Sequence, residues 1–209
     1  MPRSPAVIAL VAIVAVLSVL LVGCSGGAAF DPTRPCTPDG AGDGVAPGTY
    51  PELEQAIPSH FRGEPPKNLD SGRTCSTEGL STLGEHGITE VRFAGGTWQT
   101  GPDSGVSLAV FTSATGPALQ ATWMEEFYEA GARTGRNVQS VEPSDYAIGS
   151  IAGKRVDVLN GESYQTVIAW PRDGRVAVVL IGSFIRDIQT REAHEGVVKQ
   201  AVAGFDNGR

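Results

Sequence analysis

The chain has 209 residues, of which 41% are hydrophobic and 19% charged, with a formal net charge of −7. This composition is ordinary for one soluble domain with some additional chain, and it excludes a multi-span membrane protein, a disulfide-dense miniprotein and a disordered acidic tail. Because the acidic residues are scattered and the basic residues form no run, we expect no nucleic-acid partner.

The first segment is an apolar run of 17 residues, Ala6–Val22, which only Ser18 interrupts and which follows Arg3 and the amino terminus. This pattern is typical of an export signal. Seventeen residues is also the lower limit for a membrane-spanning helix, so an uncleaved anchor is the competing interpretation. The length of the run does not decide between them.

The residues that close the run, Leu21-Val22-Gly23-Cys24, resemble the lipobox of bacterial lipoprotein precursors at all four positions. The resemblance implies that residues 1–23 are a signal peptide and that Cys24 becomes the first residue of the mature chain, with a diacylglycerol on its sulfur. Two or three acyl chains, at about 0.8 kcal/mol per buried CH₂, hold a protein stably at a membrane. The implied location is therefore extracytoplasmic, at the cell membrane, with fatty acids such as palmitate as the anchor.

The two remaining cysteines, Cys36 and Cys75, form an even pair in a chain expected to be exported. Thiols outside the cytoplasm are usually oxidised, so we predict a disulfide between them. Two free thiols are the alternative. No metal-binding spacing accompanies these cysteines, and we predict no metal or cofactor.

Residues 24–49 are rich in Gly and Pro and contain almost no large apolar side chains. Such a segment is typical of a tether. A calcium loop at Asp39 and Asp43 is a weak alternative, because the alternating ligands and the distal Glu of an EF-hand are missing. If Cys36 is bonded to Cys75, the free part of the tether is the 12 steps from Cys24 to Cys36, roughly 40 Å when extended.

From residue 50 to residue 209, the hydrophobic pattern predicts a single globular domain of strands and helices. In chain order we expect a helix at 51–60, a short helix at 77–83, strands at 88–99 and 105–112, a helix at 117–134, strands at 138–147, 153–159, 163–170 and 175–183, and a helix at 187–205.

The two long helices carry the clearest pattern. In the first, Pro117 stands at the first helical position, and Leu119, Trp123, Phe127 and Ala130 form an apolar stripe. In the second, we expect Ile188, Val198, Val202 and Phe205 to face inward. On the solvent side of these helices we expect i,i+4 ion pairs, Glu129 with Arg133 and Arg191 with Glu195.

The resulting fold class is α+β: a two-layer sandwich with a mainly antiparallel sheet and both long helices on one face. The strands at 105–112 and 175–183 are apolar at almost every position, which is typical of strands covered on both faces. Either the segment from Cys36 to Leu83 covers the second face, or part of that face is an apolar cleft.

Two segments resemble catalytic motifs, but neither lies in the secondary structure that its motif requires. Ser107 lies in a sequence similar to a GxSxG nucleophile motif, but it stands at the beginning of a strand, and Gly149–Arg155 resembles a phosphate loop without opening a helix. The three histidines, His60, His86 and His194, lie far apart in the sequence, and structural roles are their simplest interpretation. The acidic group Glu125, Glu126 and Glu129 is typical of a solvated helix face. We therefore predict no catalytic residues.

Aromatic side chains at strand ends are the remaining candidates for binding. Trp98 lies between glycines and Trp170 precedes Pro171, and together with Tyr164 they are our candidates for a ligand site. The alternative is that both tryptophans cap the edges of the core.

Three functions stay open. The first is a non-enzymatic binding domain for an envelope protein, a cell-wall component or a small ligand. The second is a carrier of lipid or another apolar ligand in a cavity between sheet and helices. The third is an extracytoplasmic hydrolase, in which a histidine and a carboxylate would converge on a serine or a bound water. The missing catalytic arrangement favours the first.

Overall fold

The computed structural model describes residues 30–207. The apolar run, the lipobox and Cys24 therefore lie outside the described residues. Within the described part, no helix is long and apolar enough to span a membrane.

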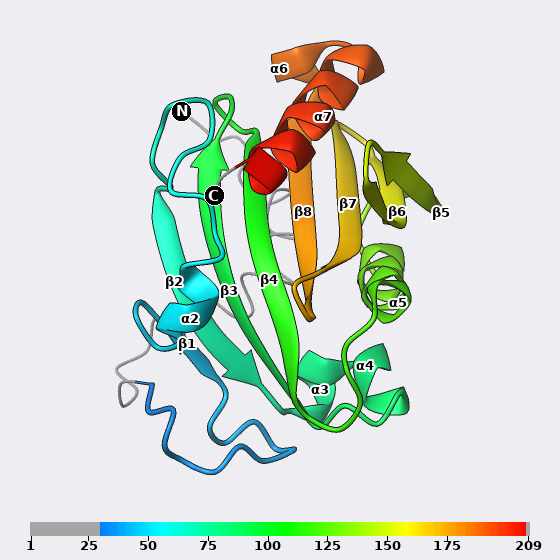
Figure 1. Cartoon of the computed structure of the whole chain (residues 1–209). Coiled ribbons are helices and arrows are strands. Elements are labelled where there is room, and N and C mark those ends of the chain that lie inside the picture. The colour runs from blue at the N-terminus through cyan, green and yellow to red at the C-terminus, as the bar shows by residue number, and fades with distance from the viewer. Residues whose placement is uncertain (1–29, 208–209) are drawn as a thin grey trace, which may run out of the picture.

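The protein is built on one eight-stranded sheet in the order β1-β2-β3-β4-β8-β7-β6-β5, in which every neighbouring pair is antiparallel (Figure 1). The strands are β1 (Gly44–Ala46), β2 (Asn68–Thr74), β3 (Glu90–Gln99), β4 (Gly105–Thr115), β5 (Val138–Ile148), β6 (Ile151–Asn160), β7 (Ser163–Arg172) and β8 (Arg175–Phe184). The mainly antiparallel sheet of the α+β prediction is confirmed.

Short turns join the last four strands. The turn between β7 and β8 is Asp173-Gly174, and both residues have positive φ angles, 51° and 75°. Two consecutive positive φ angles are the signature of a type I′ turn, whose twist matches that of an antiparallel pair. The sequence Asp-Gly thus fixes the register of β7 and β8.

Within residues 30–207 the helices beside the sheet are α2 (Pro51–Glu54), α3 (Thr77–Leu80), α4 (Thr82–Glu85), α5 (Ala121–Arg133), α6 (Ile185–Ile188) and α7 (Arg191–Asn207). The first long helix, α5, is shorter than its predicted range of 117–134. The predicted helix 187–205 is split into α6 and α7, because Gln189 between them has a left-handed φ of 60°. The predicted helix 51–60 keeps only its first turn.

The two long helices lie on opposite faces of the sheet, so the prediction that they share one face is wrong. α7 packs with α2 on a core that contains Leu53, Val198 and Phe205, whereas α5 packs with α3 and α4 on a core that contains Leu80 and Met124. The physical reason is the composition of β4 and β8. Because both faces of these strands are apolar, each face needs its own cover.

The segment from Cys36 to Leu83 contributes to both covers. Leu53 and Ile57 join the α7 face, and Leu80 and Leu83 join the α5 face. The second face is therefore covered by α5 together with α3 and α4.

The buried stripe of α5 differs from the predicted one by about one residue. Met124, Tyr128 and Ala132 are the buried side chains, while Trp123 and Phe127 are only partly buried. The helix begins at Ala121 and not at Pro117, so the chain approaches the sheet through an extended segment. Gly116 precedes this segment with a φ of 93°, and a Cβ there would lie 2.7 Å from the backbone oxygen of Gly87.

The inward residues predicted for the last helix are confirmed in part. Val198, Val202 and Phe205 are buried, and Ile188 is half-buried. The outward pair Glu129–Arg133 is present on α5 at 2.6 Å. Arg191 and Glu195 have other partners, which belong to the site described below.

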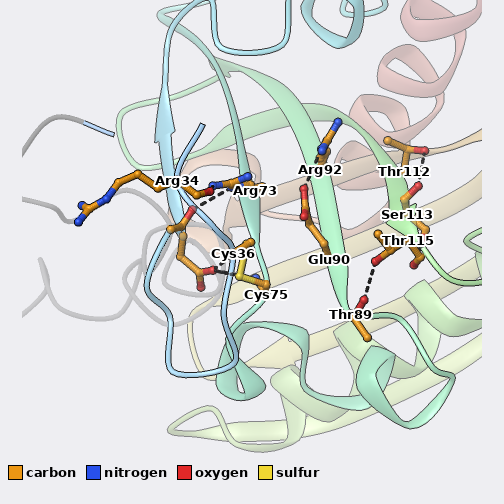
Figure 2. Close-up of polar contacts among 12 residues, drawn as sticks. Arg34, Cys36, Arg73, Cys75, Thr89, Glu90, Arg92, Thr112, Ser113 and Thr115 are labelled. Carbon is orange, nitrogen blue, oxygen red and sulfur yellow. Dashed lines mark hydrogen bonds and ion pairs between the residues drawn. A yellow bond between two sulfur atoms is a disulfide. The ribbon is translucent and has the colours of Figure 1, made fainter. Parts of the chain in front are cut away.

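Residues 30–49 are part of the fold, in contrast to the predicted tether. β1 pairs with Ser71–Arg73 of β2, and the predicted disulfide between Cys36 and Cys75 is present (Figure 2). We call residues 30–46 together with β2 the N-terminal edge. Neither β1 nor β2 was predicted from the sequence.

Candidate functional site

The most distinctive polar feature is a buried histidine at the beginning of α7. His194 is only 2% exposed, and it stands on the apolar stripe of α7 one turn before Val198. Its Nδ1 lies 2.9 Å from Oγ of Ser183 on β8, and its Nε2 lies 2.8 Å from Oγ1 of Thr166 on β7. Both ring nitrogens thus have a partner inside the protein.

The direction of these hydrogen bonds follows from the next partner. The Thr166 hydroxyl donates its single proton to Oδ1 of Asp157 on β6, at 2.6 Å. It therefore accepts from Nε2–H of His194, and Nδ1 of the neutral ring accepts from the Ser183 hydroxyl. The network is a chain of donors from Ser183 through His194 and Thr166 to the Asp157 carboxylate.

Burial lowers the pKa of His194 to about 4, although the neighbouring carboxylates of Glu195 and Asp157 act in the opposite direction. A positive charge on a ring that is almost fully buried would lose most of its hydration. The imidazole is therefore neutral at pH 7, which agrees with the hydrogen-bond directions above.

The Asp157 carboxylate is held by two arginines. Nε and Nη2 of Arg155 donate to its two oxygens at 2.7 and 2.8 Å, and Nη2 of Arg191 lies 3.4 Å away. Arg155 also donates to Glu195 on α7, at 3.1 Å from Nη1 and through a second bond from Nη2. These ion pairs replace the predicted Arg191–Glu195 pair, and they attach α7 to β6.

A hollow lies between the start of α7 and the strands β5, β6 and β7. Asp157, Thr166 and His194 line it from the network, and Glu142, Tyr164 and Arg191 line its outer part. Its interior space of about 10 Å³ corresponds to about one water molecule. The hollow is therefore too small to hold an acyl chain.

The network resembles a serine–histidine–carboxylate arrangement, with Thr166 inserted between the histidine and the carboxylate. A nucleophile must be reachable by its substrate. Ser183 is 0% exposed, so no substrate reaches its hydroxyl in this structure. The arrangement fits a structural bond between α7 and the sheet, and it gives no support to the hydrolase.

Only one of the three predicted ligand-binding aromatics lies at the hollow. The Tyr164 ring is 5.9 Å from the His194 ring, measured between centroids. Trp98 and Trp170 are each 4% exposed and lie in the core beneath α7, where Nε1 of Trp98 donates to the carbonyl of Glu64 and Trp170 packs on Phe205. The tryptophans therefore cap the core, which was the alternative interpretation.

The other predicted groups are dispersed. His86 pairs with Glu126 at 2.5 Å and stacks on Trp123, with ring centroids 4.6 Å apart, while His60 is exposed. Glu129 pairs with Arg133, and Glu125 lies 3.8 Å from Lys154. Each carboxylate of this helix has its own basic partner, so the three do not converge on one point.

Cys36, Cys75 and Asp43 come close together, within 4.8 Å. The two thiols are joined in the disulfide, and the Asp43 carboxylate accepts from the backbone N–H of Cys75 at 2.7 Å and from the Thr74 hydroxyl at 2.8 Å. Asp39 instead accepts from Thr37 and Ala41 within its own turn. Asp43 thus fixes the disulfide region to β2, and the two aspartates do not share a ligand.

Sequence reasoning did not find the network of Ser183, His194, Thr166 and Asp157. One signal was present: His194 is spaced by four residues from Val198 and by eight from Val202, which places it on the buried face of the helix. The partners of His194 on the strands are the hydroxyl groups of Ser183 and Thr166. The pattern of apolar and polar residues does not show whether such a side chain is buried or lies on the surface.

Comparison with protein-family models, with curated proteins and with solved structures found no match. The functional conclusion therefore depends on the sequence motif and on the geometry described above.

Proposed function

We propose that the chain is the precursor of an extracytoplasmic lipoprotein, anchored to the cell membrane by acyl chains on Cys24, whose α+β domain is a non-enzymatic binding domain. The observation that carries this proposal is the lipobox Leu21-Val22-Gly23-Cys24 at the end of an apolar run. Signal peptide, residues 1–23, and lipidated Cys24 follow from the same resemblance.

The disulfide supports an extracytoplasmic location. Cys36 and Cys75 are bonded, and structural disulfides persist mainly in oxidising compartments. Ser183, the serine bonded to the buried histidine, is itself fully buried, which favours binding over catalysis.

The binding surface that we favour is the hollow with Tyr164. Polar and charged side chains, among them Glu142, Tyr164 and Arg191, stand around it, which favours an envelope protein, a cell-wall component or a small polar ligand as the partner. The carrier of lipid is the weaker alternative, because the space at the hollow is about that of one water molecule.

Labelling with radioactive palmitate tests the anchor. The wild-type protein is expected to incorporate the label and to sediment with membranes, and a Cys24→Ala variant is expected to do neither. A Ser25→Ala variant, which changes the adjacent residue and leaves the sulfur in place, is the control and should behave as wild type. Equal labelling of the Cys24→Ala variant would contradict the proposal.

Native mass spectrometry of the protein from its own envelope tests the binding domain. A co-purified polar compound, peptide or wall fragment is expected, and a Tyr164→Ala variant should lose it. A co-purified lipid, in addition to the covalent acyl chains, would instead favour the carrier.

A further inference from the structure

The N-terminal edge fixes the place at which the anchor joins the domain. The guanidinium of Arg73 is buried at 4% exposure, and it donates from Nε to the carbonyl of Gly42 at 2.9 Å and from Nη2 to the carbonyl of Arg34 at 2.5 Å (Figure 2). It also lies over the ring of Phe30, with 5.8 Å from Cζ to the ring centroid. The chain is therefore in contact with β2 from Phe30 onward.

Three further attachments hold the same segment. They are the Cys36–Cys75 disulfide, the Asp43 carboxylate, which accepts from the Thr74 hydroxyl on β2 and from Cys75 N–H, and the hydrogen bond at 3.0 Å from Thr77 N–H to the carbonyl of Pro38. Because these bonds are spread from Phe30 to Ala46, this segment does not act as a flexible spacer.

The length of free chain follows directly. Six steps separate Cys24 from Phe30, and at 3.3–3.6 Å each they span at most about 20 Å. This is about half the reach that the sequence alone suggested for the tether. A lipid on Cys24 would keep the N-terminal edge close to the bilayer surface.

The hollow lies at the far corner of the sheet from this edge. Four inter-strand steps separate β2 from β7, and at about 4.8 Å each they amount to roughly 19 Å. The position of Thr166 along the strands is found by following paired residues across the sheet. Thr166 pairs with Ile181, Ile181 with Val106 and Val106 with Trp98, which lies next to the partner of Asn68 at the start of β2. Cys75 follows Asn68 by seven residues, or roughly 23 Å, so the two places are about 30 Å apart. Figure 1 shows residues 30–43 at the lower left and the start of α7 with β5 and β6 at the upper right.

We infer that the lipidated protein stands on the membrane with its N-terminal edge toward the bilayer and its hollow turned away from it. This inference depends on the proposed function, because it takes Cys24 as the anchor. The partner at the hollow therefore approaches from the aqueous side and not from within the bilayer.

Energy transfer to the membrane tests the orientation. The full lipidated protein is inserted into vesicles of phosphatidylglycerol and phosphatidylethanolamine that carry an acceptor dye on a fraction of the headgroups. A donor dye is attached through a non-natural amino acid, which leaves the three cysteines unchanged, at Glu78 or at Glu162. Both are exposed glutamates; Glu78 lies on α3 beside the N-terminal edge, and Glu162 lies in the turn between β6 and β7.

Donor quenching is expected to be several-fold greater at Glu78 than at Glu162. A variant with 20 additional Gly and Ser residues inserted after Ala28 should reduce the quenching at Glu78. The difference in quenching between Glu78 and Glu162 should then become smaller. Equal quenching at the two positions in the wild-type protein, or no effect of the insertion, would overturn the orientation. If the purified protein has no acyl mass, the proposed function fails and the inference fails with it, whereas an acylated protein with equal quenching contradicts the inference alone.

Discussion

The N-terminal edge and the α7 corner of the sheet are held by different kinds of bonds. At the N-terminal edge a disulfide, a strand pairing and a buried arginine fix residues with little apolar surface. At the α7 corner, side-chain hydrogen bonds from Ser183 to Asp157 join a helix to three strands, above an apolar core. The first attachment depends on oxidation and the second depends on the charge of one histidine. The two regions should therefore respond to different perturbations.

Loss of the disulfide should have the largest effect. The double variant Cys36→Ser/Cys75→Ser opens a loop with a sequence separation of 39 residues, for which the chain-entropy model gives about 4 kcal/mol of unfolding free energy. Denaturant unfolding measures this loss. Thr33→Ala, an exposed change in the same segment, should alter the unfolding free energy by no more than about 0.5 kcal/mol. A loss below about 1 kcal/mol in the double variant would show that the edge is held without the disulfide.

Acid should weaken the α7 corner by the next largest amount. The pKa of His194 is about 4 in the folded protein and 6.5 when unperturbed. Between these pH values His194 is protonated in the unfolded chain and neutral in the folded protein. The contribution of neutral His194 to the unfolding free energy is therefore fully present above pH 6.5, and about 3 kcal/mol of it is lost as the pH drops to 4.

A His194→Gln variant isolates this effect, because glutamine can donate and accept but does not titrate. Its unfolding free energy should fall less than that of wild type over the same pH range. His60→Gln, which changes an exposed histidine, should retain the wild-type slope. Equal slopes for wild type and His194→Gln would contradict the predicted charge state.

The Thr166→Val variant should have a smaller effect on the same corner. Removal of the hydroxyl leaves Nε2–H of His194 without an acceptor, which costs about 1–2 kcal/mol at neutral pH. Thr166→Ser retains the hydroxyl and should recover most of this loss. If valine and serine destabilise equally, the lost methyl contacts and not the hydrogen bond would explain the change.

The smallest effect is expected at an ion pair outside both regions. Glu129→Gln removes the partner of Arg133 on the solvent side of α5 and should cost a few tenths of a kcal/mol. Thermal unfolding in low and high salt measures it, and the difference should vanish in high salt. A loss as large as that of Thr166→Val would mean that surface pairs contribute as much as the buried network.

The central part of the fold could be predicted from local sequence. β3 to β8 and the long helices follow from apolar runs, from the Asp173-Gly174 turn and from the period of the helical stripes. The disulfide could be predicted because only two cysteines remain after Cys24.

β2 could not be predicted in the same way. Its sequence, NLDSGRT, is polar, and the buried Arg73 and Thr74 are bonded to β1, Asp43 and residues 30–42. These partners lie 25 or more residues away in the chain, and no local pattern reports them. The sequence also does not predict that the long helices lie on opposite faces. Strands that are apolar on both sides do not show which helix covers which side.

The sites show the same division. Tyr164 was identified as a candidate and lies at the hollow, but Trp98 and Trp170 belong to the core, because a position at a strand end does not determine the face on which a ring packs. His194 lacked a visible partner in the sequence because Ser183, Thr166 and Asp157 come from three different strands.

The intact mass of the protein extracted from membranes tests the anchor most directly. We predict the mass of residues 24–209, with the single disulfide, plus a diacylglyceryl group and any further acyl chain at the new amino terminus. A mass equal to residues 1–209 without lipid, or a shorter unmodified chain in the soluble fraction, would contradict both the anchor at Cys24 and the orientation derived from it.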